Sequence, residues 1–491
     1  MMSGQGGAQR AAVEPGSLEN ALVDFLQGLR IEDIPADSRE HVKQSFLDTL
    51  GAALAGTAAE GTDALVAQVA EWGGHEQSRV IGFPHRVSFP DATIINTTMA
   101  RALELDDVHE MAMLHPSVSV IPTALAWADW QGPVTGAELL ASCVAGMELV
   151  CRLGLTPIYH VAGDKHKPRW FSYTYQCGTF GAAAVVARLM KLDRDRTLSA
   201  LGNAYSQMAG NQQGIQEGVL IVRVQQGLSA RDGAIGALLA AKGITGGRHM
   251  LEGKFGYLNA FCGGEYDRRQ LLDGLGQTFQ VDQISIKPYP CCKITHASVS
   301  AALELVETND LKPSDIESVT VQISSRESWD EVCQPVAEKR RPKTSVDAQF
   351  SLPFVVASAI VKRRVSLDEV GAAGLSDPDI LAMAQRVEPV HDPDAEVSQG
   401  RVLPMPVTME MRLANGKTLN LWKRFPYGHP QNRMAWIGVE QKFRECAERA
   451  RVRVADKSLD AIIEAVRHLE ELKDARELNQ LLAEGGLRGG A

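Results

Sequence analysis

The densest group of ionisable side chains lies between residues 104 and 115. The stretch begins Glu-Leu-Asp-Asp-Val-His-Glu at Glu104 and ends at His115. A carboxylate that accepts a hydrogen bond from one nitrogen of a histidine fixes the tautomer and prepares the other nitrogen for proton transfer. An equally weighted alternative is structural. In it, Asp106 and Asp107 cap the next helix, and the histidine is a buried polar residue with its hydrogen bonds satisfied.

A second segment, residues 284–296, reads Ile-Ser-Ile-Lys-Pro-Tyr-Pro-Cys-Cys-Lys-Ile-Thr-His. Its two prolines favour a rigid, extended backbone that displays Lys287, Lys293 and His296. A lysine in a cleft can neutralise a substrate carboxylate or stabilise an enolate-like intermediate, although most lysines are surface charges. Adjacent cysteines are poorly placed to chelate one ion together, so the Cys-Cys pair is interpreted as a packing feature.

A third polar segment, residues 211–227, contains Arg223. It matches neither the phosphate-loop spacing nor the dinucleotide-binding pattern of glycines, which disfavours nucleotide binding. A guanidinium can hold a carboxylate in two-point geometry. Arg223 is therefore a candidate for binding an anionic substrate, with a surface salt bridge as the alternative of equal weight.

The composition limits the classes of function. The chain has 491 residues, 45% hydrophobic and 22% charged, which predicts two domains with substantial cores. A formal net charge of -10 argues against nonspecific nucleic-acid binding. No apolar run approaches the length of a membrane span. The eight cysteines form no C-x-x-C pair, and residues 1–16 lack the apolar core of a signal peptide. We therefore expect reduced thiols, a disordered tail over 1–16 and a cytoplasmic location.

The elements that must position these residues are mainly helical. Apolar residues at three- and four-residue intervals, in Ala- and Gly-rich sequence, predict closely packed helices through the first half of the chain. These helices cover residues 18–29, 39–54, 91–102, 117–130, 136–153, 178–189, 198–208 and 228–241. The group at 104–115 would then form a loop between two rigid helices, a common position for functional residues.

The pattern changes after Gly274. Residues 319–323 and 407–413 alternate between apolar and polar, as half-buried strands do, and Asn-Gly at 415–416 predicts a hairpin turn. Helices are expected over 348–361 and 378–387, and again after residue 424. We therefore predict a mainly α fold, in which a large discontinuous all-helical domain accompanies a smaller α+β lid domain. The helical domain takes residues 17–275 and 425–485, and the lid domain takes residues 276–424.

Taken together, the motifs resemble those of the MmgE/PrpD family. The resemblance rests on the loop ending in His-Pro-Ser at 115–117 and on the segment from Lys287 to His296. Two further blocks, Gly-Thr-Phe-Gly at 178–181 and Asp-Ala-Gln-Phe-Ser-Leu-Pro-Phe at 347–354, follow the family order. The family includes 2-methylcitrate dehydratase, cis-aconitate decarboxylase and iminodisuccinate epimerase. The resemblance implies a homodimer, a small carboxylate substrate bound between the domains, and no metal or organic cofactor.

The resemblance also implies roles for individual residues. His115 matches the histidine expected to transfer protons, Asp106 and Asp107 match the acidic pair of its loop, and Lys287 matches a lysine expected to contact substrate. We take these four as the catalytic candidates. Further candidates for substrate binding, drawn from the same segments and from the polar residues near the Gly-Thr-Phe-Gly block, are Glu104, His109, Ser172, Tyr173, Arg223, Lys293 and His296.

The chain departs from the family pattern at four positions. Ser172 and Gln225 stand where relatives often have histidine, Val108 replaces a common threonine, and Phe354 replaces a tyrosine. These substitutions remove two imidazoles and two hydroxyl groups, which puts methylcitrate itself in doubt as the substrate.

Four hypotheses of function follow. The leading one is a cofactor-free hydro-lyase of the 2-methylcitrate dehydratase type, which removes a proton next to a carboxylate of a hydroxylated di- or tricarboxylate. Decarboxylation of a cis-aconitate-like acid, or epimerisation of a dicarboxylate, is the alternative on the same scaffold. A metal-dependent hydrolase that uses Asp106, Asp107, His109 and His115 is a third hypothesis. The fourth is a scaffold that has lost its activity.

Overall fold

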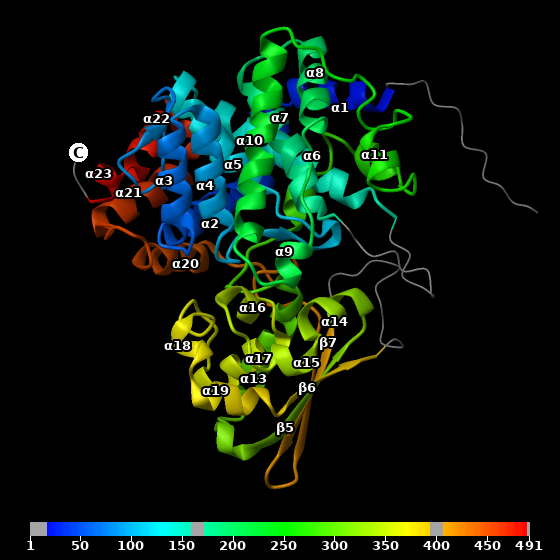
Figure 1. Cartoon of the computed structure of the whole chain (residues 1–491), viewed down its shortest axis with the longest axis vertical. Coiled ribbons are helices and arrows are strands. Elements are labelled where there is room, and N and C mark those ends of the chain that lie inside the picture. The colour runs from blue at the N-terminus through cyan, green and yellow to red at the C-terminus, as the bar shows by residue number, and fades with distance from the viewer. Residues whose placement is uncertain (1–16, 159–170, 393–405, 489–491) are drawn as a thin grey trace, which may run out of the picture.

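The computed structural model describes residues 17–158, 171–392 and 406–488. The expected disordered tail over 1–16 lies outside these ranges. The structure divides into a large helical part and a smaller part that contains a four-stranded sheet (Figure 1). The expected fold class, mainly α with a smaller α+β domain, is confirmed.

The helical domain combines the two ends of the chain. Figure 1 shows the C-terminal helices beside α2 and α3, and α20 packs on α2. Its helices are α1 (Ser17–Gly28), α2 (Ala36–Gly56), α3 (Thr62–Trp72), α4 (Phe89–Arg101), α5 (Ser117–Gln131), α6 (Gly136–Leu155), α7 (Tyr173–Leu189), α8 (Arg194–Tyr205), α9 (Gln213–Gln216), α10 (Ile221–Ala241), α11 (Tyr257–Ala260), α12 (Arg269–Leu272), α20 (Trp436–Glu448), α21 (Asp456–Arg467), α22 (Arg476–Leu482) and α23 (Glu484–Leu487).

Small residues allow these helices to approach closely. Helix α10 packs against α4, α7 and α8. A Cβ atom at Gly233 would collide with the carbonyl oxygen of Thr179 on α7, and one at Gly227 would collide with that of Ile94 on α4. The Ala- and Gly-rich composition of this region therefore serves close helix packing, because larger side chains would separate the backbones.

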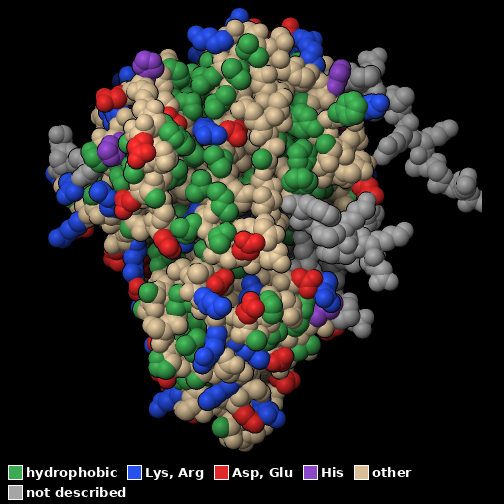
Figure 2. Space-filling model, in the orientation of Figure 1, with side chains coloured by type: hydrophobic (Ala, Val, Ile, Leu, Met, Phe, Trp, Pro, Cys, Tyr) green, Lys and Arg blue, Asp and Glu red, His purple; other side chains and the backbone are tan. Residues whose placement is uncertain are grey.

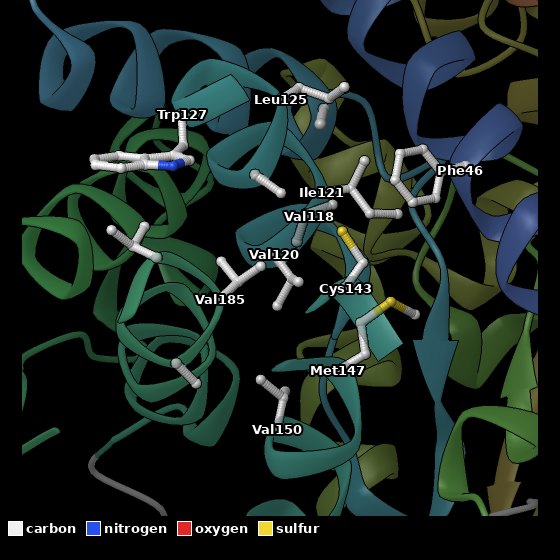
Figure 3. Close-up of a cluster of buried hydrophobic side chains, with 14 of the residues drawn as sticks. Phe46, Val118, Val120, Ile121, Leu125, Trp127, Cys143, Met147, Val150 and Val185 are labelled. Carbon is white, nitrogen blue, oxygen red and sulfur yellow. The ribbon is translucent and has the colours of Figure 1, made fainter. Parts of the chain in front are cut away.

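The core of the helical domain is aliphatic. Figure 3 shows part of it, where Val120 and Ile121 of α5 lie near Met147 of α6 and Val185 of α7. All four side chains are fully buried. This core supports both ends of the loop between α4 and α5, which carries the predicted site.

The lid domain is an α+β unit. Its sheet has the order β6-β5-β7-β8. Strand β6 (Val387–His391) is parallel to β5 (Ile316–Ile323). Strand β7 (Val407–Leu413) is antiparallel to both of its neighbours, β5 and β8 (Thr418–Lys423). Helix α13 packs on β7 and β8, and α17 packs on β6. The lid helices are α13 (His296–Thr308), α14 (Arg326–Cys333), α15 (Val336–Lys339), α16 (Ser345–Gln349), α17 (Leu352–Lys362), α18 (Ala372–Leu375) and α19 (Pro378–Ala384).

Several boundaries differ from the sequence expectation, three of them in or next to the lid domain. The side chains of Phe279, Val281 and Ile286 are buried in the helical core, so the lid core begins beyond 286 and not at 276. The helix expected over 348–361 is two helices, because the Ser351 side chain caps a new helix start. The helix expected over 378–387 ends at Ala384, and the chain then enters β6.

Two further observations concern the surface and the cysteines. In Figure 2, acidic and basic side chains are interspersed over both domains on the visible face. No helix in the described part of the chain is long and apolar enough to cross a membrane. All eight cysteines are free thiols.

Candidate active site

The two segments selected from the sequence lie side by side. A short strand in the loop, β3 (Val108–His109), pairs antiparallel with β4 (Ile284–Ser285), which precedes Lys287. The loop itself contains two residues with positive φ, Glu104 at 54° and Met113 at 55°. Non-glycine residues adopt this region at an energetic cost and often do so at functional sites. The pairing of β3 with β4 therefore brings the loop acids to the lysine.

Four charged side chains form a buried cluster at this junction. Lys287 Nζ lies 2.8 Å from Glu104 Oε2 and 3.5 Å from Asp106 Oδ1. Arg101, at the end of α4, pairs with Glu104 and lies 3.4 Å from Asp106 Oδ1. All four residues are at most 5% exposed. Two cations and two carboxylates therefore neutralise one another away from water. Without this pairing, the desolvation of four buried charges would be strongly unfavourable.

The cluster keeps its members ionised. Burial alone would raise the pKa of both carboxyls, but Arg101 and Lys287 outweigh this effect and lower the pKa of Glu104. The pKa of Asp106 is lowered well below its usual range, with His115 as a further cause. In Lys287, burial opposes the charge, but the two carboxylates outweigh it and raise the pKa.

His115 is oriented by the same loop. Its Nδ1 lies 2.7 Å from the carbonyl oxygen of Asp107 and 2.9 Å from Asp106 Oδ2. Because a carbonyl oxygen only accepts, Nδ1 carries the proton and donates it to this bond. The neutral ring therefore has its basic lone pair on Nε2, for which the described residues supply no hydrogen-bond partner. The imidazole is 14% exposed, so it combines a fixed tautomer with access from outside the core.

Asp107 has a different environment from Asp106. Its carboxyl is fully buried and accepts hydrogen bonds from the backbone N–H and the hydroxyl of Ser117, the first residue of α5. Burial, with smaller contributions from Asp48 and Asp106, outweighs these hydrogen bonds and raises the pKa of Asp107 to about 8. Asp107 therefore supports the start of α5, whereas Asp106, the other residue of the structural alternative, contacts Arg101, Lys287 and His115 instead.

The raised pKa of Asp107 has a consequence for stability. Between about pH 4, where an aspartate of the unfolded chain loses its proton, and about pH 8, the folded protein retains a proton that the unfolded chain has released. Stability should therefore fall as pH rises through this window, by at most about 1.4 kcal/mol per pH unit. Asp107→Asn removes this titrating carboxyl and therefore its contribution to the pH dependence of stability. Urea unfolding at pH 5 and pH 8 should show a smaller decline for the variant, and an equal decline in both proteins would contradict the assignment.

A second buried ion pair lies next to the first cluster. Glu110 Oε1 accepts a hydrogen bond of 2.5 Å from the Ser285 hydroxyl and lies 3.2 Å from Lys293 Nζ, while Glu110 Oε2 lies 3.8 Å from His429 Nε2. Burial lowers the pKa of Lys293 despite its acidic neighbour. The pKa of Glu110 is lowered because Lys293 and His429 outweigh its burial. Lys293 is thus paired within the protein.

The other predicted binding residues are placed as follows. The His296 Nε2 lies 3.1 Å from the Cys291 carbonyl oxygen, in a fully buried position where burial lowers its pKa well below the usual value. The His109 Nδ1 accepts a hydrogen bond from the Ala112 N–H. Ser172 is the N-cap residue of α7, which begins at Tyr173, and Ser172 is 8% exposed. The structure thus gives structural hydrogen bonds to both histidines.

The side chains named for the metal hypothesis are engaged elsewhere. Asp106 faces Arg101 and Lys287, Asp107 faces Ser117, and the Nδ1 of His115 faces a carbonyl. Within residues 17–158, 171–392 and 406–488, no three His, Cys, Asp or Glu side chains are arranged to hold a metal ion.

Comparison with family models decides the relationship. The MmgE/PrpD N-terminal domain matches residues 20–270, and the MmgE/PrpD C-terminal domain matches residues 289–470. The chain belongs to the MmgE/PrpD family. The family resemblance inferred from the motifs is therefore confirmed over nearly the whole chain.

Several curated relatives of this MmgE/PrpD protein are named for one reaction. It is 26% identical to the cis-aconitate decarboxylase-like protein oryM of Aspergillus oryzae, over 95% of this chain and 98% of the relative. It is 29% identical to a cis-aconitate decarboxylase of Aspergillus terreus, over 77% and 80% of the two chains. The Homo sapiens cis-aconitate decarboxylase is 24% identical over 95% and 94%. The family and these relatives identify the chain as an enzyme of the lyase type.

Some residues of this MmgE/PrpD member's site were missed by the sequence analysis. Arg101 is one, because a single arginine near a helix end gives no local signal. The Lys442–Asp48 pair is another. Lys442 Nζ lies 2.5 Å from Asp48 Oδ1 and 2.6 Å from the Leu105 carbonyl oxygen, so the C-terminal helix α20 holds the loop in place. Thr174, the neighbour of Tyr173 in sequence, was also missed. Its hydroxyl oxygen accepts a hydrogen bond of 3.0 Å from the His115 backbone N–H.

Proposed function

We propose that this protein decarboxylates a small unsaturated polycarboxylate of the cis-aconitate type, with His115 as the proton donor. The observation that carries the proposal is the environment of this imidazole. Its Nδ1 is engaged by the Asp107 carbonyl and by ionised Asp106, and its Nε2 has no partner among the described residues. The names of the relatives support the choice of substrate class and of reaction.

The chemistry requires one proton and charge compensation. The bond between a carbon and its carboxylate carbon breaks, CO₂ leaves, and the electron pair remains on the carbon next to the double bond. Nε2 of the His115 imidazolium then gives its proton to the carbon chain, and the ring regains a proton from solvent. Asp106 stays ionised, so it compensates the positive charge that the ring carries before the transfer.

Dehydration of the 2-methylcitrate type, the leading hypothesis from the sequence, is the second candidate. It would use the same histidine to move a proton, but it also needs a group that protonates the departing hydroxyl. Position 172, the N-cap of α7, holds serine where relatives often hold histidine. This lost imidazole, together with the names of the relatives, favours decarboxylation over dehydration.

One assay separates the reactions. Purified protein is incubated in heavy water with cis-aconitate and, separately, with 2-methylcitrate, and is followed by NMR and by release of CO₂. We expect release of CO₂ from cis-aconitate with one solvent deuterium in the product. Loss of water from methylcitrate would support a dehydratase, and exchange of deuterium without loss of either group would support an epimerase. Absence of any reaction, with no ligand-induced rise of the melting temperature, would indicate a scaffold without activity.

The remaining expectations belong to the same proposal. A homodimer can be tested by light scattering of the full chain. Independence of metals can be tested by elemental analysis and by activity after exhaustive chelation, and loss of activity on chelation would revive the metal-dependent hypothesis. The cytoplasmic location inferred from cysteine usage remains an expectation.

A further inference from the structure

A cavity of about 250 Å³ lies between the helical domain and the lid. From the helical side it is lined by Ala55 at the end of α2, by Leu103, which precedes the site acid Glu104, and by Arg223 on α10. From the lid side it is lined by Gln349 of α16 and by Leu367. The size is slightly below that of typical ligand pockets, which suits a small organic acid.

The guanidinium of Arg223 is buried in this cavity with few partners. The residue is 5% exposed, and its one hydrogen bond to the described residues is the 2.9 Å bond from Nη1 to the Glu60 carbonyl oxygen. Nε is buried without an acceptor. A guanidinium has five N–H donors, and a buried charge with most donors unused is costly. A bound anion could accept hydrogen bonds from these unused donors and compensate the charge of the guanidinium.

No described carboxylate fills that role. Ion pairs of Arg223 within 4.0 Å are absent among the described residues, although Glu60, which also lines the cavity, and Glu104 act on it at longer range. Glu104 is already engaged by Arg101 and Lys287. The other cation that lines the cavity, Arg449, is held by Asp368 through two bonds of 2.7 Å. Arg223 is therefore the cation available to a ligand here.

The rest of the lining is largely apolar. Ala55, Leu103 and Leu367 give the cavity aliphatic walls, together with Ala58, Ala59 and Val370. A ligand that matches this surface combines one carboxylate with a hydrocarbon part, because apolar surface gains from contact only with apolar groups. A compact tricarboxylate alone would leave these walls without a partner.

We propose that this cavity binds the distal arm of the substrate, with a carboxylate on Arg223 and an alkyl or alkenyl segment against the apolar walls. The inference rests on the proposed function, because it assigns the cavity to the same substrate. The cavity and the charged cluster are linked by two consecutive residues. Leu103 lines the cavity, and the next residue, Glu104, belongs to the cluster. The preferred substrate is then an acid with a longer hydrocarbon part than cis-aconitate.

Straight-chain monocarboxylates test the proposal. Acetate, butyrate and hexanoate, with butyramide as the neutral counterpart of butyrate, are titrated into the full-length protein by calorimetry. We expect affinity to rise roughly fourfold per methylene group and butyramide not to bind. We expect Arg223→Gln to weaken butyrate and hexanoate about 10- to 100-fold, as loss of a charged hydrogen bond does. Arg412→Gln, which removes an exposed positive charge on strand β7, should leave their affinity unchanged.

A second variant and a competition assay complete the test. Leu367→Ala keeps Arg223 and should weaken hexanoate more than acetate, even if Arg223→Gln folds poorly. Hexanoate should also inhibit turnover competitively. Equal affinity of acetate and hexanoate, unchanged binding in Arg223→Gln, or noncompetitive inhibition, which would indicate a separate carboxylate site, would each overturn the proposal. Binding is read by calorimetry, so failure of the proposed reaction would not conceal this result.

Discussion

Substitution of His115 by asparagine should lower kcat about a thousandfold, within the hundred- to ten-thousandfold range typical of general acid–base groups. An asparagine side chain can still donate the hydrogen bond that Nδ1 makes to the Asp107 carbonyl, but it has no counterpart of Nε2. The variant therefore removes the proton donor and keeps the loop contact. Steady-state kinetics on the acid that the wild-type protein converts measures the effect.

Two controls separate this loss from a folding defect. The melting temperature of His115→Asn should stay close to that of the wild type, because the imidazole is partly exposed and its structural bond is retained. His468→Asn changes an exposed histidine that lies between Glu464 and Glu471, and should leave kcat unchanged. If His115→Asn retained wild-type turnover, the assignment of the proton donor would be wrong.

Substitution of Lys287 by methionine should destabilise the protein by about 3–5 kcal/mol, the cost of breaking a buried ion pair from one side. The lysine is fully buried between Glu104 and Asp106. This geometry gives Lys287 a structural role, and its contact with substrate stays a prediction. Without its ammonium, two buried carboxylates would share the single positive charge of Arg101. Urea unfolding at pH 7 measures the change.

A double variant identifies the cause. In Lys287→Met with Glu104→Gln, one cation and one carboxylate disappear together, so the cluster is again balanced by Arg101 and Asp106. We expect the double variant to be more stable than Lys287→Met alone, with a coupling energy of at least 1 kcal/mol. Additive effects would mean that the lysine stabilises the fold through packing and not through charge.

The buried cluster also bears on substrate binding. Arg101 and Lys287 are matched by Glu104 and Asp106, so the cluster brings no unpaired cation to an anionic substrate. Lys293 is likewise matched by Glu110. Arg223, by contrast, has no paired acid among the described residues, which is why the proposed carboxylate contact was placed there.

The sequence by itself determined the fold class and most helices. Helix α5 follows the expected range 117–130, and β7 follows the alternation at 407–413, because burial of one face imposes a local period on the sequence. Local signals also selected Asp106 and His115, which lie nine residues apart in one loop. The break between α16 and α17 was missed because Phe350 and Leu352 flank Ser351, so the cap leaves no wide gap in the apolar pattern.

Only the tertiary structure decided which charges meet. Lys287 and Glu104 are 183 residues apart in sequence, and Lys442 and Asp48 are 394 residues apart. Their ionisation depends on the distances between several charges and on burial, neither of which a local pattern encodes. For the same reason, sequence alone could not separate Asp106, which stays ionised, from its neighbour Asp107, whose pKa is raised to about 8. Residue types and spacing indicated where protons could move, and packing determined which groups carry them.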